Sequence, residues 1–327
     1  MRRREFITLL GGATIAWPLA ARAQQAALPV IGFLSSASPD DYTIRLRAFR
    51  QGLKDAGYVE GQNVTVEYRW AEDQYSRLPL LAAELVRRKV NVIVAGGGTP
   101  SAVAAKAATA TIPIIFAVAV DPVKTGFVAN LKRPGGNLTG VTNLNVEVAQ
   151  KRLELLHELL PTATVIAALV NPTSALTEPF LQALQPAARA LGVQLRVLQA
   201  STDRDLDAAF AKLVELRASA LVISPDTFFN AHTEQLAALS LRHAMPTIFQ
   251  QRTFVAAGGL LSYGSDESEY YRLVGIQAGK ILKGEKPADL PVMQSTKVEL
   301  MINLKTAKAL GINVPLPLLG RADEVIE

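Results

Sequence analysis

VNVIVAGGGTPSAVAA, Val90–Ala105, is the stretch of sequence that decides the predicted fold. Val92-Ile93-Val94 is a β-branched run, too short for a helix and typical of a buried parallel strand. Three glycines follow, and Thr99-Pro100-Ser101 then opens an alanine-rich run that is typical of a helix. We expect Thr99 at the N-cap and Pro100 at the first helical position, because a hydroxyl accepts from an unpaired amide and proline needs no amide partner.

Such a strand–turn–helix junction directs bare N–H groups and the positive end of a helix dipole at one place. It is therefore a candidate binding site for a carboxylate or phosphate. The alternative is that the glycines only permit a tight turn, since many α/β turns of this kind bind nothing. The stretch by itself leaves both interpretations open.

Working outward, strands and helices alternate on both sides of this stretch. Four strand–helix steps in a row require parallel pairing with right-handed crossovers, which predicts a doubly wound sheet. The loops at the carboxyl ends of three strands, Ser35-Ser36, Gly97–Thr99 and Ala117–Asp121, should converge at one edge of that sheet. The strands expected around the central one are 30–34, 63–68 and 112–117.

After the turn-rich segment Arg133–Asn137 the same alternation starts again. The sequence therefore predicts two similar α/β lobes. The helix expected over Ala175–Leu191 contains Pro179 and Pro186, so we expect it to be kinked or split. The strands expected in this half are 165–170, 194–198, 220–223 and 247–249, with a further strand from 258 and a late one at 298–303.

Charge and composition exclude several classes of function. The formal charge of +5 falls to +2 when residues 1–23 are removed, and no basic stripe remains, so no nucleic-acid partner is expected. The absence of cysteine excludes disulfides, thiolate catalysis and Cys-ligated metals. The three histidines are scattered, which makes a histidine-rich metal site unexpected, and no cofactor is predicted.

Residues 1–23 have the three parts of an export signal, with a charged front, an apolar middle and the small-residue end Ala21-Arg22-Ala23. Arg3-Arg4-Glu5-Phe6-Ile7 resembles the twin-arginine export motif. A membrane anchor is the alternative, but the apolar run is too short and is interrupted by Pro18. We expect cleavage near Ala23, no lipid anchor, and a soluble periplasmic protein.

Two lobes create a cleft, which is the commonest place for a small-molecule site, and domains linked by a few strands can close on a ligand. Asp121 and Asp226 each follow a strand end next to a proline. Each carboxylate could pair with a ligand ammonium group, or could be an ordinary turn residue.

Arg252 could bind a carboxylate bidentately or serve in a structural ion pair. Aromatic side chains that could line an apolar pocket, or simply form core, are Tyr42, Trp70, Phe116, Phe228, Phe229 and Phe249.

Catalytic motifs are missing from the sequence. There is no nucleophile elbow, zinc-protease motif, Walker A or dinucleotide fingerprint, and GGGTPS lacks the lysine that would reach a nucleotide. Glu267 and Glu269 flank a helix start, where acidic residues are expected in any case. Two alternatives to a binding protein remain open here: an exported enzyme acting on a sugar or nucleotide-like substrate, with Asp226 or Glu267 as acid–base, and a ligand sensor for a membrane kinase.

The sequence resembles a known family, the solute-binding proteins of ABC transporters grouped with the tryptophan/tyrosine-type proteins. The resemblance covers essentially the whole mature chain. The stretches that carry it are IGFLSS (31–36), AFRQGLKDAGYVEGQNVTVEYRWAE (48–72), AGGGTPSA (95–102), DPVKTGFVANLKRPGGNLTGVT (121–142), AAGGLLSYG (256–264), INLKTAKALGI (302–312) and the terminal RADEVIE. The twin-arginine signal differs from the lipoprotein signal of many relatives.

This resemblance implies a type I periplasmic-binding-protein fold with three crossings between the lobes. The first lobe would hold residues 28–141 and 254–286, and the second 142–253 and 287–327. It implies a monomer that does no chemistry and delivers a solute, by default an amino acid and often an aromatic one, to a permease in the inner membrane. The implied ligand-binding residues are Ser36, Gly98, Thr99 and Asp121 in the first lobe, and Asn171, Ser174, Asp226, Phe228 and Gln250 in the second.

Overall fold

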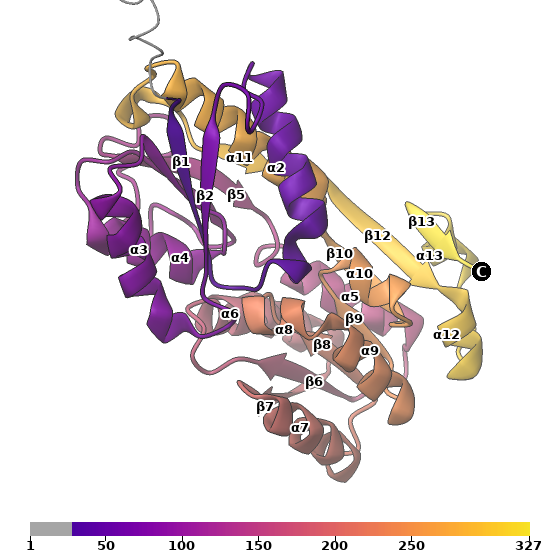
Figure 1. Ribbon diagram of the computed structural model, residues 1–327. Helices are drawn as coiled ribbons and strands as arrows, with labels where there is room; N and C mark the ends of the chain where they lie inside the picture. Colours follow the sequence, from indigo (N-terminus) through magenta and orange to yellow (C-terminus); the bar gives the residue numbers. More distant parts are fainter. Residues whose placement is uncertain (1–27) are drawn as a thin grey trace, which may run out of the picture.

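A computed structural model of the protein describes residues 28–327 (Figure 1). The predicted export signal lies outside these residues. The described chain forms two α/β lobes, each built on its own sheet, which confirms the predicted fold class. The first lobe lies at the top of Figure 1 and the second below it, with the C-terminus at the far edge of the second (Figure 1).

The first sheet has six strands in the order β11-β5-β4-β3-β1-β2, and every neighbouring pair is parallel. Buried β-branched and aromatic residues form its central strands. Strand β5 was not predicted from the sequence, because LTGVTN mixes polar residues with a glycine. That glycine is required, since a Cβ on Gly140 would lie 2.2 Å from the Phe116 carbonyl oxygen. The strands are β1 (Val30–Ser35), β2 (Thr65–Trp70), β3 (Val92–Ala95), β4 (Ile114–Val118), β5 (Leu138–Asn143) and β11 (Met293–Ser295).

The second sheet has seven strands in the order β13-β12-β10-β9-β8-β6-β7. All its pairs are parallel except β10 with β12, which run antiparallel. Its strands are β6 (Val165–Val170), β7 (Gln194–Gln199), β8 (Ala220–Ile223), β9 (Thr247–Phe249), β10 (Leu261–Ser265), β12 (Val298–Asn303) and β13 (Glu324–Ile326).

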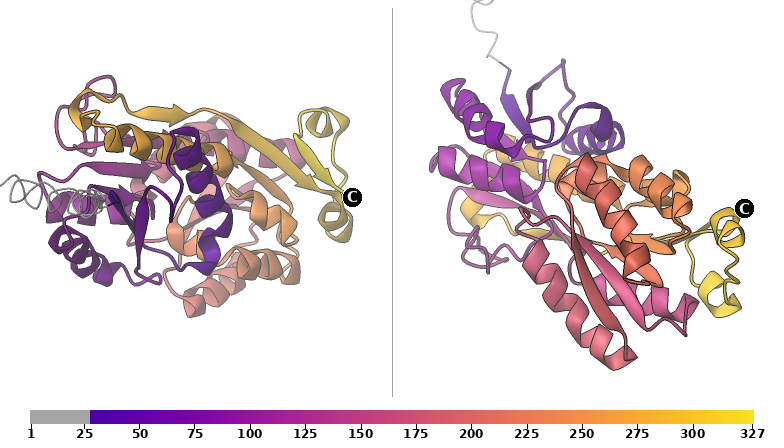
Figure 2. Two further views of the ribbon diagram at one scale, coloured as in Figure 1. Left: turned by 45° about the horizontal axis from the view of Figure 1, so that its top comes forward. Right: turned by 90° about the horizontal axis from the view of Figure 1, so that it is seen from below.

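Helices cover both faces of each sheet. In the first lobe α2 and α11 lie side by side on one face, and α3 and α4 cover the other (Figures 1 and 2). In the second lobe α5 and α6 share one core, and α7, α9 and α10 share the other. The helices are α2 (Thr43–Asp55), α3 (Leu78–Arg87), α4 (Thr99–Ala108), α5 (Ala149–Leu159), α6 (Thr177–Leu191), α7 (Asp203–Glu215), α8 (Thr227–Ala231), α9 (Thr233–Arg242), α10 (Arg252–Ala256), α11 (Glu267–Leu282), α12 (Leu304–Ala309) and α13 (Leu316–Leu319), with 3-10 turns at Asp40–Tyr42, Tyr75–Arg77 and Pro287–Asp289.

The chain crosses between the lobes after β5, after β10 and after β11. The expected boundaries are wrong in two places. Residues 254–265 belong to the second lobe, because β10 pairs with β9 and β12 before the chain crosses. Residues 293–295 belong to the first lobe, because β11 pairs with β5.

Two local expectations about helices also need correction. Gly98, with φ of 80°, is the N-cap of α4, so Thr99 and Pro100 are its first two helical residues. A positive φ is costly for other residues, which explains why the last of the three glycines takes this position. Of the kink or split expected for the helix over 175–191, the split is wrong, because α6 is one continuous helix with Pro186 inside it.

Candidate functional site

A cleft between the lobes is lined by residues of both, at the carboxyl ends of the strands. Its empty volume is about 620 Å³, solvent at the mouth included. The lining residues of the first lobe and its crossings are Tyr42, Arg45, Gly98, Thr99, Pro100, Ala117, Ala119, Asn143, Asn145, Glu267, Tyr270 and Tyr271; those of the second are Ser174, Ala175, Leu176, Pro225, Asp226, Thr227, Asn230 and Gln250.

The start of α4 forms one end of the cleft. Thr99 is buried, and its Oγ1 has no hydrogen-bond partner among the described residues. The first amides of an α-helix also lack partners within the helix, and this end carries the positive end of the dipole. Ser36 does not line the cleft, but its hydroxyl donates to the Gly97 carbonyl at 2.7 Å and so fixes the turn. This end of the cleft can accept an anion.

Asp226 forms the facing end, in the second lobe. Its carboxylate caps α8 by accepting from the Phe228 amide at 3.0 Å, and it also accepts from Asn171 Nδ2 at 2.9 Å. Burial raises the pKa of Asp226, although these hydrogen bonds oppose the shift. No lysine or arginine of residues 28–327 forms an ion pair with it. A buried carboxylate without a cation is well placed to bind a ligand ammonium group.

The two ends are close together. A Cβ on Gly98 would lie only 3.3 Å from the methyl group of Thr227, the residue after Asp226. Tyr75 of the first lobe also forms a short hydrogen bond with the Thr227 hydroxyl. The lobes therefore touch across the cleft, as in a closed form.

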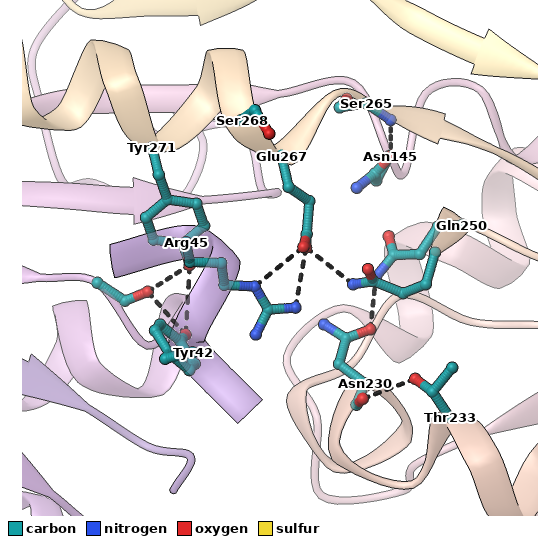
Figure 3. Close-up of polar contacts among 12 residues, drawn as sticks. Tyr42, Arg45, Asn145, Asn230, Thr233, Gln250, Ser265, Glu267, Ser268 and Tyr271 are labelled. Atoms are coloured by element: carbon teal, nitrogen blue, oxygen red, sulfur yellow. Dashed lines mark hydrogen bonds and ion pairs between the residues drawn. The ribbon is translucent and has the colours of Figure 1, made fainter. Parts of the chain in front are cut away.

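Three tyrosines form an aromatic wall on the first-lobe side. The hydroxyls of Tyr42 and Tyr271 donate to the Gly96 carbonyl at 3.0 and 2.7 Å (Figure 3). The Tyr270 hydroxyl donates to the Val118 carbonyl at 3.2 Å. Because backbone carbonyls occupy these hydroxyls, the tyrosines offer the cleft mainly their ring surfaces, which suit a flat or apolar group.

Arg45 and Glu267 form a bidentate ion pair at the mouth, with Nε–Oε2 and Nη2–Oε1 distances of 3.1 and 2.9 Å (Figure 3). The Arg45 side chain is only 9% exposed and also lies over the Tyr42 ring at 4.7 Å. In the second lobe, Gln250 Nε2 donates to Asn230 Oδ1 at 2.9 Å, while its own Oε1 is buried without a partner among the described residues. Gln250 can therefore accept from a ligand.

Seven of the nine predicted ligand-binding residues lie in or directly behind the cleft. Gly98, Thr99, Ser174, Asp226 and Gln250 line it, while Ser36 and Asn171 support it from behind.

The other two predicted residues lie elsewhere. Asp121 folds back on its own turn, where Oδ1 accepts from the amides of Val123 and Lys124, and its side chain is 40% exposed. Phe228 packs in the second-lobe core, because capping of α8 by Asp226 turns the ring inward against Phe229.

The remaining sequence candidates separate in the same way. Of the aromatic set, Tyr42 lines the cleft, whereas Trp70 packs against the first-lobe core and Phe116, Phe229 and Phe249 are core residues. Arg252 pairs with Glu324 at 2.7 Å on the surface, as the structural alternative predicted. The main residues missed are Arg45, Asn143, Asn145, Asn230, Tyr270 and Tyr271. Asn143 is the last residue of β5 and Asn145 lies just beyond it, so they would have been candidates if this strand had been predicted.

Within residues 28–327 no group of His, Cys, Asp and Glu side chains is arranged to hold a metal ion. The same residues contain no helix that is both long and apolar enough to span a membrane.

Comparison with known proteins identifies the family. Residues 30–326 match the ABC transporter substrate binding protein family, and the chain belongs to it. Members of this family bind small-molecule solutes outside the cytoplasm and deliver them to an ABC permease. This confirms the predicted class of protein, and the family is one of binding proteins, not enzymes.

Three relatives are informative. A tyrosine-binding protein of Clostridioides difficile (strain R20291) is 29% identical over 271 residues, which cover 81% of this chain and 76% of the relative. The structure of an ABC domain in complex with L-Trp from Streptococcus pneumonia has a TM-score of 0.84 at 26% identity, covering 92% of this chain and 100% of that one. A ligand-free, open substrate-binding protein with adhesive properties from Clostridium difficile scores 0.66, also at 26% identity, covering 91% and 99%.

Both solved structures have 26% sequence identity to this chain, so the difference in sequence identity does not explain their different TM-scores. The greater similarity to the ligand-bound relative agrees with the contacts between Tyr75 and Thr227 across the cleft.

Proposed function

We propose that the protein captures an L-amino acid between its lobes, by default an aromatic one. The carboxylate would lie at the start of α4 beside Thr99, and the ammonium group at Asp226. The single observation that carries this proposal is the buried Asp226 carboxylate, which pairs with no lysine or arginine of residues 28–327 and faces the positive end of a helix dipole. Opposite charges on the two lobes match the two charges of a zwitterion.

The chemistry of the wall supports an aromatic side chain. Ring surfaces of Tyr42, Tyr270 and Tyr271 line the first-lobe side, and Leu176 and Pro225 line the second. Two relatives agree with this choice, since one is named for tyrosine and the other was solved with L-Trp. Both the ring surfaces and the relatives make an aromatic L-amino acid the first solute to test.

Further parts of the predicted function belong to the same proposal. The protein acts as a monomer, performs no catalysis, and reaches the periplasm through a twin-arginine signal that is removed near Ala23. The family match supports delivery to a permease over an enzyme or a sensor. The absence of a catalytic motif supports binding without turnover.

Calorimetric titration of the mature protein with L-tyrosine and L-tryptophan tests the proposed function. Each should bind, whereas tyramine, which lacks the carboxylate, and 3-(4-hydroxyphenyl)propionate, which lacks the ammonium group, should not. Asp226→Asn should weaken binding by roughly 30-fold or more, because loss of one partner of a buried charge pair costs about 2–5 kcal/mol.

Asp121→Asn is the matched control. It removes a carboxylate from the other predicted strand-end aspartate, which lies outside the cleft, and should leave affinity unchanged. The proposed arrangement would be refuted if Asp226→Asn and Asp121→Asn lost the same amount of affinity for L-tyrosine. Binding of tyramine as tight as that of L-tyrosine would refute it as well.

A further inference from the structure

Glu267 forms a second contact between the lobes, in addition to that of Tyr75 with Thr227, at the edge of the cleft. It is the first residue of α11, directly after the chain crosses from β10, and α11 packs on the first lobe. Its Oε1 accepts from Arg45 in the first lobe at 2.9 Å (Figure 3). The same oxygen accepts from Gln251 Nε2 in the second lobe, also at 2.9 Å. One carboxylate therefore joins side chains of both lobes.

The position of this contact separates two spaces. Arg45, Asn230 and Glu267 line both the inner cleft and a wider outer groove between α2 and α9. A solute that enters from this groove must pass between Arg45–Glu267 on one side and the second-lobe residues on the other. The ion pair therefore forms part of the wall that closes the inner cleft.

Glu267 is held in place firmly enough to act on the second lobe. Arg45 binds both its oxygens, and Arg45 is itself fixed by burial and by stacking on the Tyr42 ring. Burial by itself would lower the pKa of Arg45, but the Glu267 charge and the nearby tyrosines outweigh it and raise that pKa, so the guanidinium stays charged. A hydrogen bond to an ionised group is stronger than one between neutral groups, particularly where water is partly excluded.

We propose that Glu267 is a positioning residue for solute capture. Anchored by Arg45, it binds Gln251 across the mouth and holds a closed population of the protein even before solute arrives. The proposal concerns closure and does not depend on the solute being an amino acid.

Distance measurements between spin labels on the two lobes test this proposal. Because the chain has no cysteine, Arg47→Cys on α2 and Ala238→Cys on α9, both exposed, can be labelled specifically. Electron–electron double resonance on the solute-free protein should show a closed population. Gln251→Ala, which leaves the Arg45–Glu267 pair intact, should reduce the ratio of closed to open protein about tenfold.

Two further variants complete the test. Glu267→Gln removes the ion pair with Arg45 and should reduce the closed population at least as much as Gln251→Ala does. Circular dichroism should confirm that this variant is folded. Arg272→Ala is the control, because its ion pair with Asp55 joins the same two helices, α11 and α2, at 2.6 Å without touching the second lobe. It should leave the closed population unchanged.

A solute-free wild type that is entirely open, or a Gln251→Ala distribution equal to wild type, would overturn the proposal. Rates with a chosen probe add a second readout: L-tyrosine should dissociate about tenfold faster from Gln251→Ala, with a smaller change in its association rate. Failure of L-tyrosine to bind would count against the proposed solute and leave the distance measurement as a valid test of closure.

Discussion

Asp226 and Asp121 show, at the scale of single residues, how the same local pattern leads to different roles. Both follow a strand end beside a proline. Asp226 is 4% exposed and lines the cleft, whereas the Asp121 side chain is 40% exposed and accepts hydrogen bonds from its own turn. The sequence identified both as candidates but could not distinguish them, because the direction of the turn after each strand depends on what packs around it.

The raised pKa of Asp226 predicts how affinity depends on pH. In the unliganded protein, burial favours the protonated form, so this group's contribution to stability is fully present below its unfolded pKa and is lost as pH rises through its folded pKa. A ligand ammonium group binds only the carboxylate. Affinity should therefore fall, approaching tenfold per pH unit, as pH drops through a range above the ordinary aspartate value of about 3.9.

Titration of the protein with L-tyrosine between pH 7 and pH 4 checks this prediction. Tyr75, on the first-lobe side near Asp226, does not titrate in this range, because burial raises the pKa of its hydroxyl and keeps the side chain neutral. Asp226→Asn should bind weakly and without this pH dependence. The same pH dependence in wild type and variant would show that another group titrates.

Thr99 provides a second test at the residue scale. Thr99→Val keeps the shape of the side chain and removes the hydroxyl whose oxygen has no partner among the described residues. If that hydroxyl binds a ligand carboxylate, the binding free energy should become less favourable by about 1.5–3 kcal/mol, which is the usual contribution of a hydrogen bond to a charged group. Calorimetric titration measures the loss, and thermal unfolding without solute should be nearly unchanged.

At the scale of elements, the contact between α2 and α11 organises the first lobe. The two helices approach so closely at glycines that a Cβ on Gly52 would lie 1.9 Å from the Arg272 carbonyl oxygen. On the other helix, a Cβ on Gly275 would lie 2.2 Å from the Phe49 carbonyl oxygen. This close packing places Arg45 of α2 beside Glu267 of α11.

Gly52→Ala should separate the helices and lower the free energy of unfolding by about 1–3 kcal/mol or more, because the obstructing atoms belong to backbone and cannot rotate away. Urea unfolding monitored by circular dichroism measures the change. Gly136→Ala is the control, since nothing lies within 4 Å of a Cβ there. A Gly52→Ala protein as stable as the control would mean that the helices pack less closely than described.

The sequence predicted most of the helices and strands, but it did not predict that α2 packs against α11. Both helices have apolar faces, yet they are separated by more than 200 residues, with most of the second lobe between them. Hydrophobic periodicity shows which face of a helix is buried and does not identify what covers it. The short strands β5 and β11 were missed for a related reason, because their few, partly polar residues are stabilised by pairing with neighbours.

At the scale of the whole molecule, Arg152 joins two of the segments that cross between the lobes. It is fully buried on α5, with Nη1 donating to the Tyr263 carbonyl at 3.0 Å and Nη2 to the Asn145 carbonyl. Asn145 Oδ1 in turn accepts from the Ser265 amide at 2.9 Å. Burial lowers the pKa of Arg152 to about 9, and none of the described carboxylates pairs with it. A charge is therefore costly at this position, and the value of the arginine lies in the two carbonyl groups that its guanidinium joins.

Arg152→Lys should therefore lower the free energy of unfolding by about 2 kcal/mol or more, because one ammonium group cannot replace the guanidinium between two carbonyls. Spin-label distances between the lobes should also broaden. Arg196→Lys, at an exposed position on β7, should change stability by less than about 0.5 kcal/mol. Unchanged stability and unchanged distances in Arg152→Lys would show that the crossing segments hold their arrangement without it.

The sequence by itself determined the class of fold, the two lobes, the family and the chemistry of the principal site residues. These depend on local patterns: alternation of strand and helix, glycines at a turn, and polar residues at strand ends. Only the tertiary structure decided which lobe receives β10 and β11, which of two similar aspartates enters the cleft, and that Arg45, Glu267 and Gln251 meet at its mouth. These outcomes depend on contacts between residues far apart in the chain, whose free energy is set by packing that no single segment contains.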